Sequence, residues 1–143
     1  METDKKLIIY TDGGSRGNPG PAATGVVIEA PAPTGRKQYS EAIGNTTNNV
    51  AEYKAMIFAL KKAKSLLGGD RAKETELEVR SDSELIVSQI KGEYKIKDEE
   101  LKSLFIEIWN RKQDFKNVEF ILIPREENKA ADRLVNAELD TLF

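Results

Sequence analysis

Four acidic residues occupy places in the sequence where a carboxylate can do more than keep the chain soluble. Asp12 follows the mainly apolar run 7–11, and Asp82 follows the alternating run 77–81. Glu52 and Asp132 lie in helical segments, where each shares the spacing of the inward-facing apolar residues. Four like charges that met at one place would repel one another without a cation. If the fold brings them together, the sequence therefore predicts bound metal.

The residue types narrow the chemistry of such a site. The chain contains neither cysteine nor histidine, which excludes Ser-His-Asp and Cys-His catalysis and histidine- or thiolate-bound zinc. Oxygen ligands favour magnesium, manganese or calcium. Two such ions, roughly 3.5 to 4 Å apart, can activate water and stabilise the leaving oxygen in phosphodiester cleavage.

Taken singly, Glu52 and Asp82 also have a structural explanation. The charge of Glu52 would complement the N-terminus of its helix, and Asp82 would cap the helix that follows it. Asp132 points inward in the same way as Glu52. The spacing alone leaves the nuclease interpretation and the structural interpretation both open.

The segment after Asp12, residues 13–21, is rich in glycine and proline. It does not lead directly into a helix and contains no Gly-Lys-Ser/Thr, so it is neither a dinucleotide-binding nor a nucleotide-hydrolase phosphate loop. Its backbone can approach a ligand closely, and the side chains of Ser15 and Asn18 can donate and accept hydrogen bonds.

The elements that must position these residues can be read from the pattern. Strands are predicted at 7–11, 25–28, 36–43, 77–81 and 118–123. Four helices are predicted. The first runs from 51 to the Gly68-Gly69 stop, and the second covers 85–90 with Ser81 or Asp82 as its cap. The third contains the apolar positions Leu101, Leu104, Phe105, Ile108 and Trp109, and the fourth begins at about 129. The order βββαβααβα predicts one α/β domain over residues 1–143, with a mixed five-stranded sheet and helices on its faces.

Composition predicts a soluble protein but gives no sign of its partner. The apolar run at 7–10 is too short for a signal peptide or a membrane span, so we expect a cytoplasmic location. The formal net charge of −2 and pI near 5.4 lack the broad basic field of many nucleic-acid binders. Evidence for a nucleic-acid partner must therefore come from local motifs.

Four motifs, in order along residues 7–138, resemble ribonuclease H of type 1. They are Tyr10-Thr11-Asp12-Gly13-Gly14 with Gly17-Asn18-Pro19-Gly20-Pro21, then Thr46-Thr47-Asn48-Asn49-Val50-Ala51-Glu52, then Ser81-Asp82-Ser83, and Glu127-Asn128-Lys129-Ala130-Ala131-Asp132. The resemblance implies a ribonuclease H-like fold and hydrolysis of the RNA strand of RNA/DNA hybrids, leaving 5′-phosphate and 3′-hydroxyl ends.

The resemblance also implies roles for individual residues. The catalytic, metal-binding set would be Asp12, Glu52, Asp82 and Asp132, holding two Mg²⁺ ions, with Mn²⁺ as a substitute and Asp12 touching both ions. Contacts to the minor groove and to 2′-hydroxyls would come from Ser15, Gly17, Asn18, Asn48 and Asn49, with a contribution from Glu52. Thr47 would contact the DNA-strand phosphate.

The chain departs from the family pattern at three places. Glu84 stands where many members have a glutamine that contacts a base. The segment 124–128 lacks the histidine that assists product departure in some relatives, a role open to Arg125 or Glu127. A basic extra helix is also missing, and Lys91, Lys95 and Lys97 either meet backbone phosphate in its place or form a solvated cluster.

Three other functions compete with hybrid cleavage. They are a catalytically silent nucleic-acid-binding module, a protein-interaction domain on the same scaffold, and an enzyme of this fold acting on DNA junctions or transposon ends. The four retained acids argue against the first two, and the set matched to 2′-hydroxyls argues against the third. No protein partner is evident, and we expect a monomer.

Overall fold

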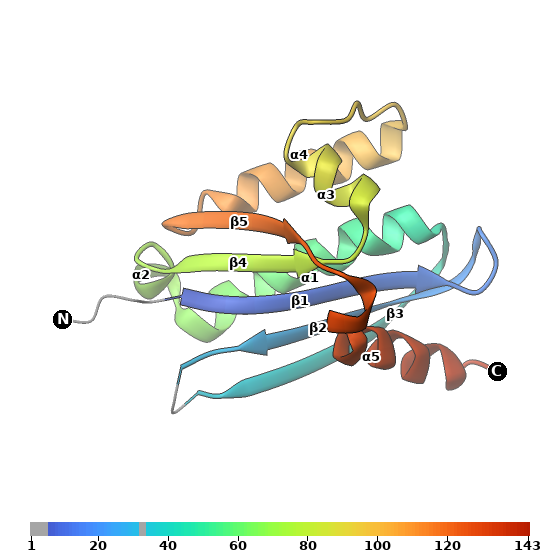
Figure 1. Cartoon of the computed structure of the whole chain (residues 1–143), viewed down its shortest axis with the longest axis horizontal. Coiled ribbons are helices and arrows are strands. Elements are labelled where there is room, and N and C mark those ends of the chain that lie inside the picture. Colours follow the sequence, from blue (N-terminus) through green and yellow to red (C-terminus); the bar gives the residue numbers. More distant parts are fainter. Residues whose placement is uncertain (1–5, 32–33) are drawn as a thin grey trace.

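Five strands form one mixed sheet in the order β3-β2-β1-β4-β5 (Figure 1). This computed structural model describes residues 6–31 and 34–143. The strands are β1 (Lys6–Ser15), β2 (Gly20–Glu29), β3 (Arg36–Thr46), β4 (Glu76–Ser81) and β5 (Asn117–Leu122). β1, β2 and β3 pair antiparallel, whereas β4 runs parallel to both β1 and β5. The mixed five-stranded α/β sheet predicted from the element order is confirmed.

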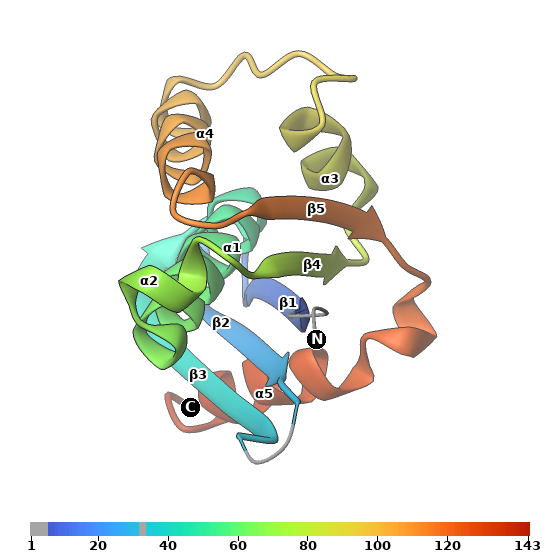
Figure 2. The ribbon, with the colours of Figure 1, turned by 90° about the vertical axis from the view of Figure 1, so that its left-hand side faces the viewer.

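The helices pack on the sheet or on one another. They are α1 (Asn48–Leu67), α2 (Gly69–Ala72), α3 (Glu84–Ile90), α4 (Glu99–Lys112) and α5 (Lys129–Asp140), with a 3₁₀ turn, η1 (Arg125–Glu127). α1 contacts β1 and β2, and α4 packs against α1. α5 lies along β1, β2 and β3, apart from α1 and α4 (Figure 2). None of the described helices is long and apolar enough to cross a membrane.

Strand alternation assigns opposite faces of β1 to α1 and α5. Leu7 and Ile9 belong to the main core beneath α1. Asp12 has the opposite parity and pairs with Gly25, where an added Cβ would lie 2.4 Å from the Ala131 carbonyl oxygen of α5. Asp12 therefore points to the α5 face, and its neighbour Gly13 points to α1.

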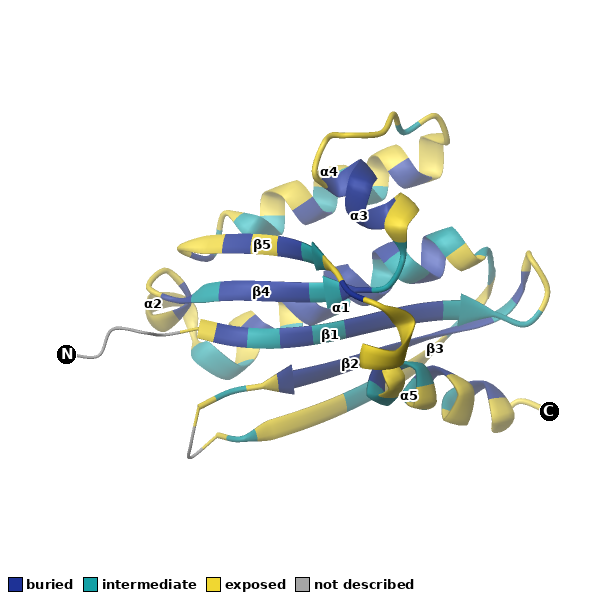
Figure 3. Cartoon of the chain, viewed as in Figure 1, coloured by how far each residue is buried: buried dark blue, intermediate teal, exposed yellow. Residues whose placement is uncertain are grey.

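Burial follows this layering. The central strands β1, β2 and β4 are largely buried, whereas the edge strand β3 is mostly exposed (Figure 3). A second, smaller core joins Ala23 of β2 to Val135 and Leu139 of α5. This apolar contact fixes α5 against the sheet independently of the main core.

Several predicted boundaries are corrected by the structure. β1 continues to Ser15, so Asp12 lies inside the strand rather than at its end, and the connecting loop is correspondingly short. The third strand extends to Thr46. The first helix begins at Asn48 rather than at 51, because the Thr47 hydroxyl caps it by accepting from the Val50 N–H at 3.2 Å. The single turn α2 was not predicted.

Two predictions about side chains are also corrected. The cap of α3 is Ser83, whose hydroxyl accepts from the Ile86 N–H, rather than Ser81 or Asp82. Trp109, placed on the apolar side of the third helix by its spacing, is 53% exposed. Leu101 and Ile108 are the buried residues of that helix.

Candidate active site

The topology places all four acidic residues at one cavity. Because β1 and β4 are parallel neighbours, Asp12 in β1 and Asp82 directly after β4 lie at the same end of the sheet. Glu52 reaches this point from the second turn of α1, and Asp132 from the first turn of α5. All four line a cavity of about 310 Å³.

Three of the acids form a tight group. Carboxylate oxygens of Asp12, Glu52 and Asp82 all lie within 4.8 Å of one another. Asp132 is outside this group but lines the same cavity. It lies beside Asp12, and the charge of Asp132 helps to raise the pKa of Asp12. The predicted convergence is thus complete for three carboxylates, with the fourth adjacent.

Burial and mutual repulsion change the acidity of this group. Asp12 is 8% exposed, and its burial, together with the charges of Asp82 and Asp132, raises its pKa to about 8. Burial and the charges of Asp12 and Asp82 hold the pKa of Glu52 well above its usual range. The arrangement opposes ionisation in the absence of a cation, and a divalent ion would offset the repulsion.

Gly13 allows α1 to bring Glu52 to the cavity. Its N–H donates to Glu52 Oε1 at 3.1 Å. A Cβ at this position would lie 2.3 Å from the backbone of Ala51, so only glycine fits between the strand and the helix. The backbone thus fixes both the distance between β1 and α1 and the orientation of the carboxylate.

Asn128 is a site residue to which the sequence reasoning gave no role. It is 1% exposed, and its Nδ2 donates to the Thr11 carbonyl oxygen at 2.9 Å and to Asp82 Oδ2 at 3.4 Å. The amide therefore ties the start of α5 to β1 and orients Asp82. Asn128 directly precedes α5, and its side chain makes no cap hydrogen bond to that helix.

Arg125 contributes positive charge to the cavity. It lies in η1, lines the cavity with the carboxylates, and its charge lowers the pKa of Glu52 against the larger effects that raise it. Of the two residues considered in place of the missing histidine, Arg125 lines this cavity, whereas Glu127 is not among the lining residues.

Several residues matched to 2′-hydroxyl recognition form one network beside the acids. Asn48 Oδ1 accepts from the Ser15 N–H at 2.8 Å and the Ser15 hydroxyl at 3.2 Å. The Asn48 N–H in turn donates to Asn18 Oδ1 at 2.9 Å. Gly17 has a φ of 94°, which favours glycine, and its carbonyl accepts from the Ser15 hydroxyl. Ser15 and Asn48 also line the acidic cavity.

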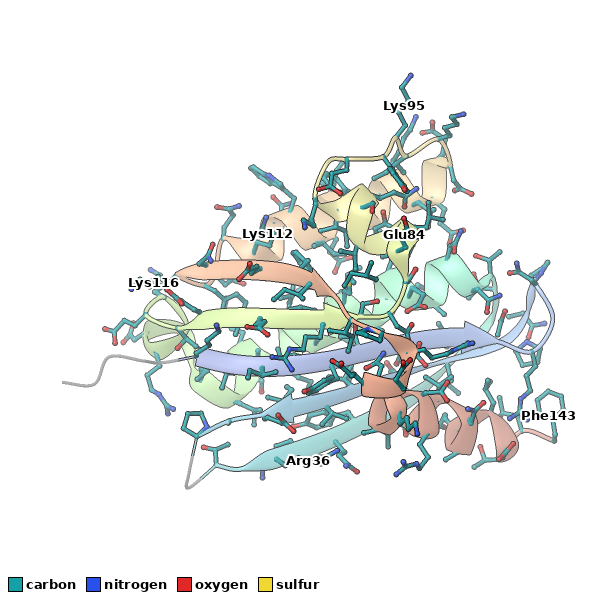
Figure 4. The ribbon with its side chains drawn as sticks, viewed as in Figure 1. Arg36, Glu84, Lys95, Lys112, Lys116 and Phe143 are labelled. Carbon is teal, nitrogen blue, oxygen red and sulfur yellow. The ribbon has the colours of Figure 1, made fainter. Side chains whose placement is uncertain are left out.

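The other sequence-predicted contacts lie outside the cavity lining. Thr47 is the cap of α1, and Asn49 is half-buried in its first turn. Glu84 is exposed on α3 and accepts a hydrogen bond from the Tyr94 hydroxyl at 3.1 Å (Figure 4). Lys95 projects from the connection after α3 (Figure 4).

The donor set fits a hard divalent cation. Every charged group in the tight cluster is a carboxylate, the ligand type that magnesium and manganese prefer. Gly13 and Asn128 supply the outer hydrogen bonds that orient two of these ligands. Asp12, Glu52 and Asp82, with Asp132 alongside, are the residues that could hold such an ion.

The chain is similar to known proteins over most of its length. Residues 10–138 match the family described as Reverse transcriptase-like. The bifunctional protein Rv2228c of Mycobacterium tuberculosis is 40% identical over 136 residues, covering 94% of this chain and 36% of that protein. Ribonuclease HI of Halobacterium salinarum is 37% identical over 131 residues, covering 92% of this chain and 63% of that enzyme.

Solved structures show the same fold. LC11-RNase H1, solved in complex with an RNA/DNA hybrid, superposes with a TM-score of 0.86 and is 48% identical, covering 95% of this chain and 98% of that one. The chain thus spans about a third of the mycobacterial relative but nearly all of this solved domain. On sequence, fold and topology together, the chain belongs to the ribonuclease H type 1 family.

Proposed function

We propose that this chain is a metal-dependent endoribonuclease that hydrolyses the RNA strand of RNA/DNA hybrids, leaving 5′-phosphate and 3′-hydroxyl ends. One observation carries the proposal: three carboxylates whose oxygens lie within 4.8 Å of one another share a cavity with a fourth. The hybrid bound in the LC11-RNase H1 structure supports the substrate class.

Asp12, Glu52, Asp82 and Asp132 would hold two magnesium ions. Such ions, when bound, activate water and stabilise the leaving oxygen of the phosphodiester. The chain's own contribution is orientation: the Asn128 amide orients Asp82 and the Gly13 N–H orients Glu52, and both hydrogen bonds are made within the protein itself.

Selection of RNA would come from the Ser15–Asn48–Asn18 network. Because Ser15 and Asn48 line the acidic cavity, a strand whose phosphate sits among the acids would present its sugars to these side chains. A 2′-hydroxyl both donates and accepts hydrogen bonds, which matches the hydroxyl of Ser15 and the amides of the two asparagines.

The direct test compares three duplexes of one sequence, RNA/DNA, RNA/RNA and DNA/DNA, in magnesium and in excess chelator. We expect cleavage of the RNA strand of the hybrid alone, its loss in chelator, and products that ligate through a 5′-phosphate. Undiminished cutting in chelator would contradict the metal site. Binding of the hybrid without cutting would favour a silent binding module.

Asn49 offers the cleanest test of substrate contact. We expect Asn49→Ala to raise KM for the hybrid about tenfold, because one polar contact to nucleic acid is worth about 1 to 3 kcal/mol. Binding of Mg²⁺ without substrate should be unchanged, as measured by titration calorimetry. Asn18→Ala is the comparison: it also removes the acceptor of the Asn48 N–H, so it should lower stability by about 1 kcal/mol as well. Equal loss of Mg²⁺ affinity in Asn49→Ala would reassign that residue to the metal site.

A further inference from the structure

The fourth carboxylate has a hydrogen-bond donor of its own one turn along α5. Asn136 Nδ2 donates to Asp132 Oδ2 at 3.3 Å. Asn136 lines the acidic cavity together with Asp132. Glu52 and Asp82 have equivalent donors in the Gly13 N–H and the Asn128 amide. Asn136 completes this pattern for the carboxylate outside the tight group.

The backbone that carries Asn136 is held from both sides. Near the start of α5, the chain passes so close to β2 that a Cβ on Gly25 would lie 2.4 Å from the Ala131 carbonyl oxygen. Farther along, the Arg16 guanidinium donates to the Asn136 carbonyl oxygen at 3.4 Å and to Asp140 Oδ1 at 2.6 Å.

Phe143 adds to this second anchor. Its ring centroid lies 5.3 Å from Arg16 Cζ, and Figure 4 shows Phe143 at the end of the molecule where β1 and β2 are joined. The segment that presents the Asn136 amide is therefore fixed to the sheet at one end and to the β1–β2 loop at the other.

We infer that Asn136 is a positioning residue that keeps the Asp132 carboxylate turned toward Asp12, ready to bind metal. Asp132 is only partly buried, and its charge helps to raise the pKa of Asp12, so these two carboxylates lie close enough to repel each other whenever both are ionised. A neutral donor on a fixed helix offsets that repulsion without competing for the cation. Outer hydrogen bonds of this kind typically change metal affinity or activity roughly 10- to 100-fold. The inference rests on the proposed metal-dependent function.

The test uses Asn136→Ala in the full chain, with Asn110→Ala on the exposed side of α4 as the matched control. Both substitutions replace an exposed helical asparagine by a better helix former, and Asn136→Ala keeps the backbone carbonyl that Arg16 contacts. Titration calorimetry with Mg²⁺ alone, without nucleic acid, should show about tenfold weaker binding for Asn136→Ala and parental binding for Asn110→Ala. Asn136→Gln, which retains an amide at the i+4 position, should recover part of the loss.

Kinetics supply a second measurement. For Asn136→Ala the Mg²⁺ concentration for half-maximal hybrid cleavage should rise about tenfold, with KM for the hybrid unchanged and the rate restored at saturating Mg²⁺. Parental or tighter Mg²⁺ binding by Asn136→Ala would overturn the inference.

These outcomes separate the inference from the proposed function. If the parent cleaves hybrid but Asn136→Ala binds Mg²⁺ as the parent does, the positioning role fails alone. If the parent binds Mg²⁺ but does not cleave hybrid, the proposed function fails, and the titration still decides the role of Asn136. If the parent binds no Mg²⁺, both fail.

Discussion

Asp12→Asn is expected to lower the rate of hybrid cleavage by several orders of magnitude while leaving the fold intact. The amide has nearly the size of the carboxylate, but it carries no negative charge for a divalent ion, so the electrostatic preorganisation around the phosphate is lost. Asp12 is the acid that lies near all three others. Its carboxylate belongs to the tight group with Glu52 and Asp82, and the charge of Asp132 helps to raise its pKa. Single-turnover cleavage at saturating Mg²⁺ measures the effect.

The same variant should be more stable than the parent in chelator, by about 1 kcal/mol at neutral pH, because it relieves a crowded functional site. The direction of this change in stability follows from the pKa of Asp12, which burial raises from 3.8 to about 8. Between these values the folded protein holds a proton that the unfolded chain releases, so parental stability falls as pH rises through this window. The advantage of Asp12→Asn should therefore grow from about pH 4 to about pH 8.

The measurement is urea unfolding in chelator at about pH 6, 7 and 8, inside the window set by the raised pKa of Asp12. The chain has no histidine, so apart from Glu52, whose pKa is also raised, few other side chains titrate in this range. Asp70→Asn, at an exposed aspartate on α2, is the control and should follow the parent in both stability and cleavage. Magnesium should stabilise the parent more than Asp12→Asn, since a ligand stabilises only the state that binds it. If Asp12 is a structural hydrogen-bond partner instead, Asp12→Asn will melt earlier in chelator and cleave hybrid in proportion to its folded fraction.

The sequence was a good guide to those parts of the site that depend on periodicity. Glu52 shares the apolar stripe of α1, and the structure brings it to the cavity from the face of the sheet that the stripe covers. Asp82 was predicted at a junction between strand and helix, where it lies. The element order predicted the mixed sheet because short connections and parallel crossovers leave few alternatives.

Local alternatives misled the sequence reasoning at two points. Residues 81–83 offer three side chains that can cap α3, and no rule of spacing decides among them. In the structure Ser83 caps the helix while the Ser81 hydroxyl accepts from the Ser83 N–H, which leaves Asp82 free to face the cavity. Gly13 and Gly14 suggested a loop, but they pair with β2 and continue the strand. Glycine has a low strand propensity, and the tertiary contact with α1 overrides it.

Long-range contacts account for most of what the sequence did not reveal. Asn128 bonds to the carbonyl of Thr11, 117 residues earlier in the chain, and its role in orienting Asp82 follows from that contact. Arg16 likewise reaches Asp140 across the gap between the β1–β2 loop and α5. Such pairs have no periodic signature, and a single sequence gives no sign that they meet.

Gly13→Ala should be among the most damaging single substitutions in the chain, with Gly14→Ala as its matched control. At Gly13 an added Cβ would lie 2.3 Å from the Ala51 carbonyl carbon and 2.6 Å from the Glu52 nitrogen, and both are backbone atoms of a packed helix. The clash can be relieved only by moving α1 from β1, which should cost about 3 kcal/mol or more. At Gly14 the nearest atom is a Val135 methyl at 3.6 Å, an ordinary contact.

Urea unfolding in chelator gives the stability of each variant, and hybrid cleavage at a temperature where both are folded gives the effect on the site. Because the displaced helix carries Glu52 away from the Gly13 N–H and from Asp12, Gly13→Ala should lose Mg²⁺ affinity and activity even when fully folded. Gly14→Ala should stay within about 0.5 kcal/mol of the parent in stability and bind Mg²⁺ as the parent does. A folded Gly13→Ala with parental Mg²⁺ affinity would show that the position of α1 does not set the metal site, and Glu52 would then have to be removed from the proposed ligands.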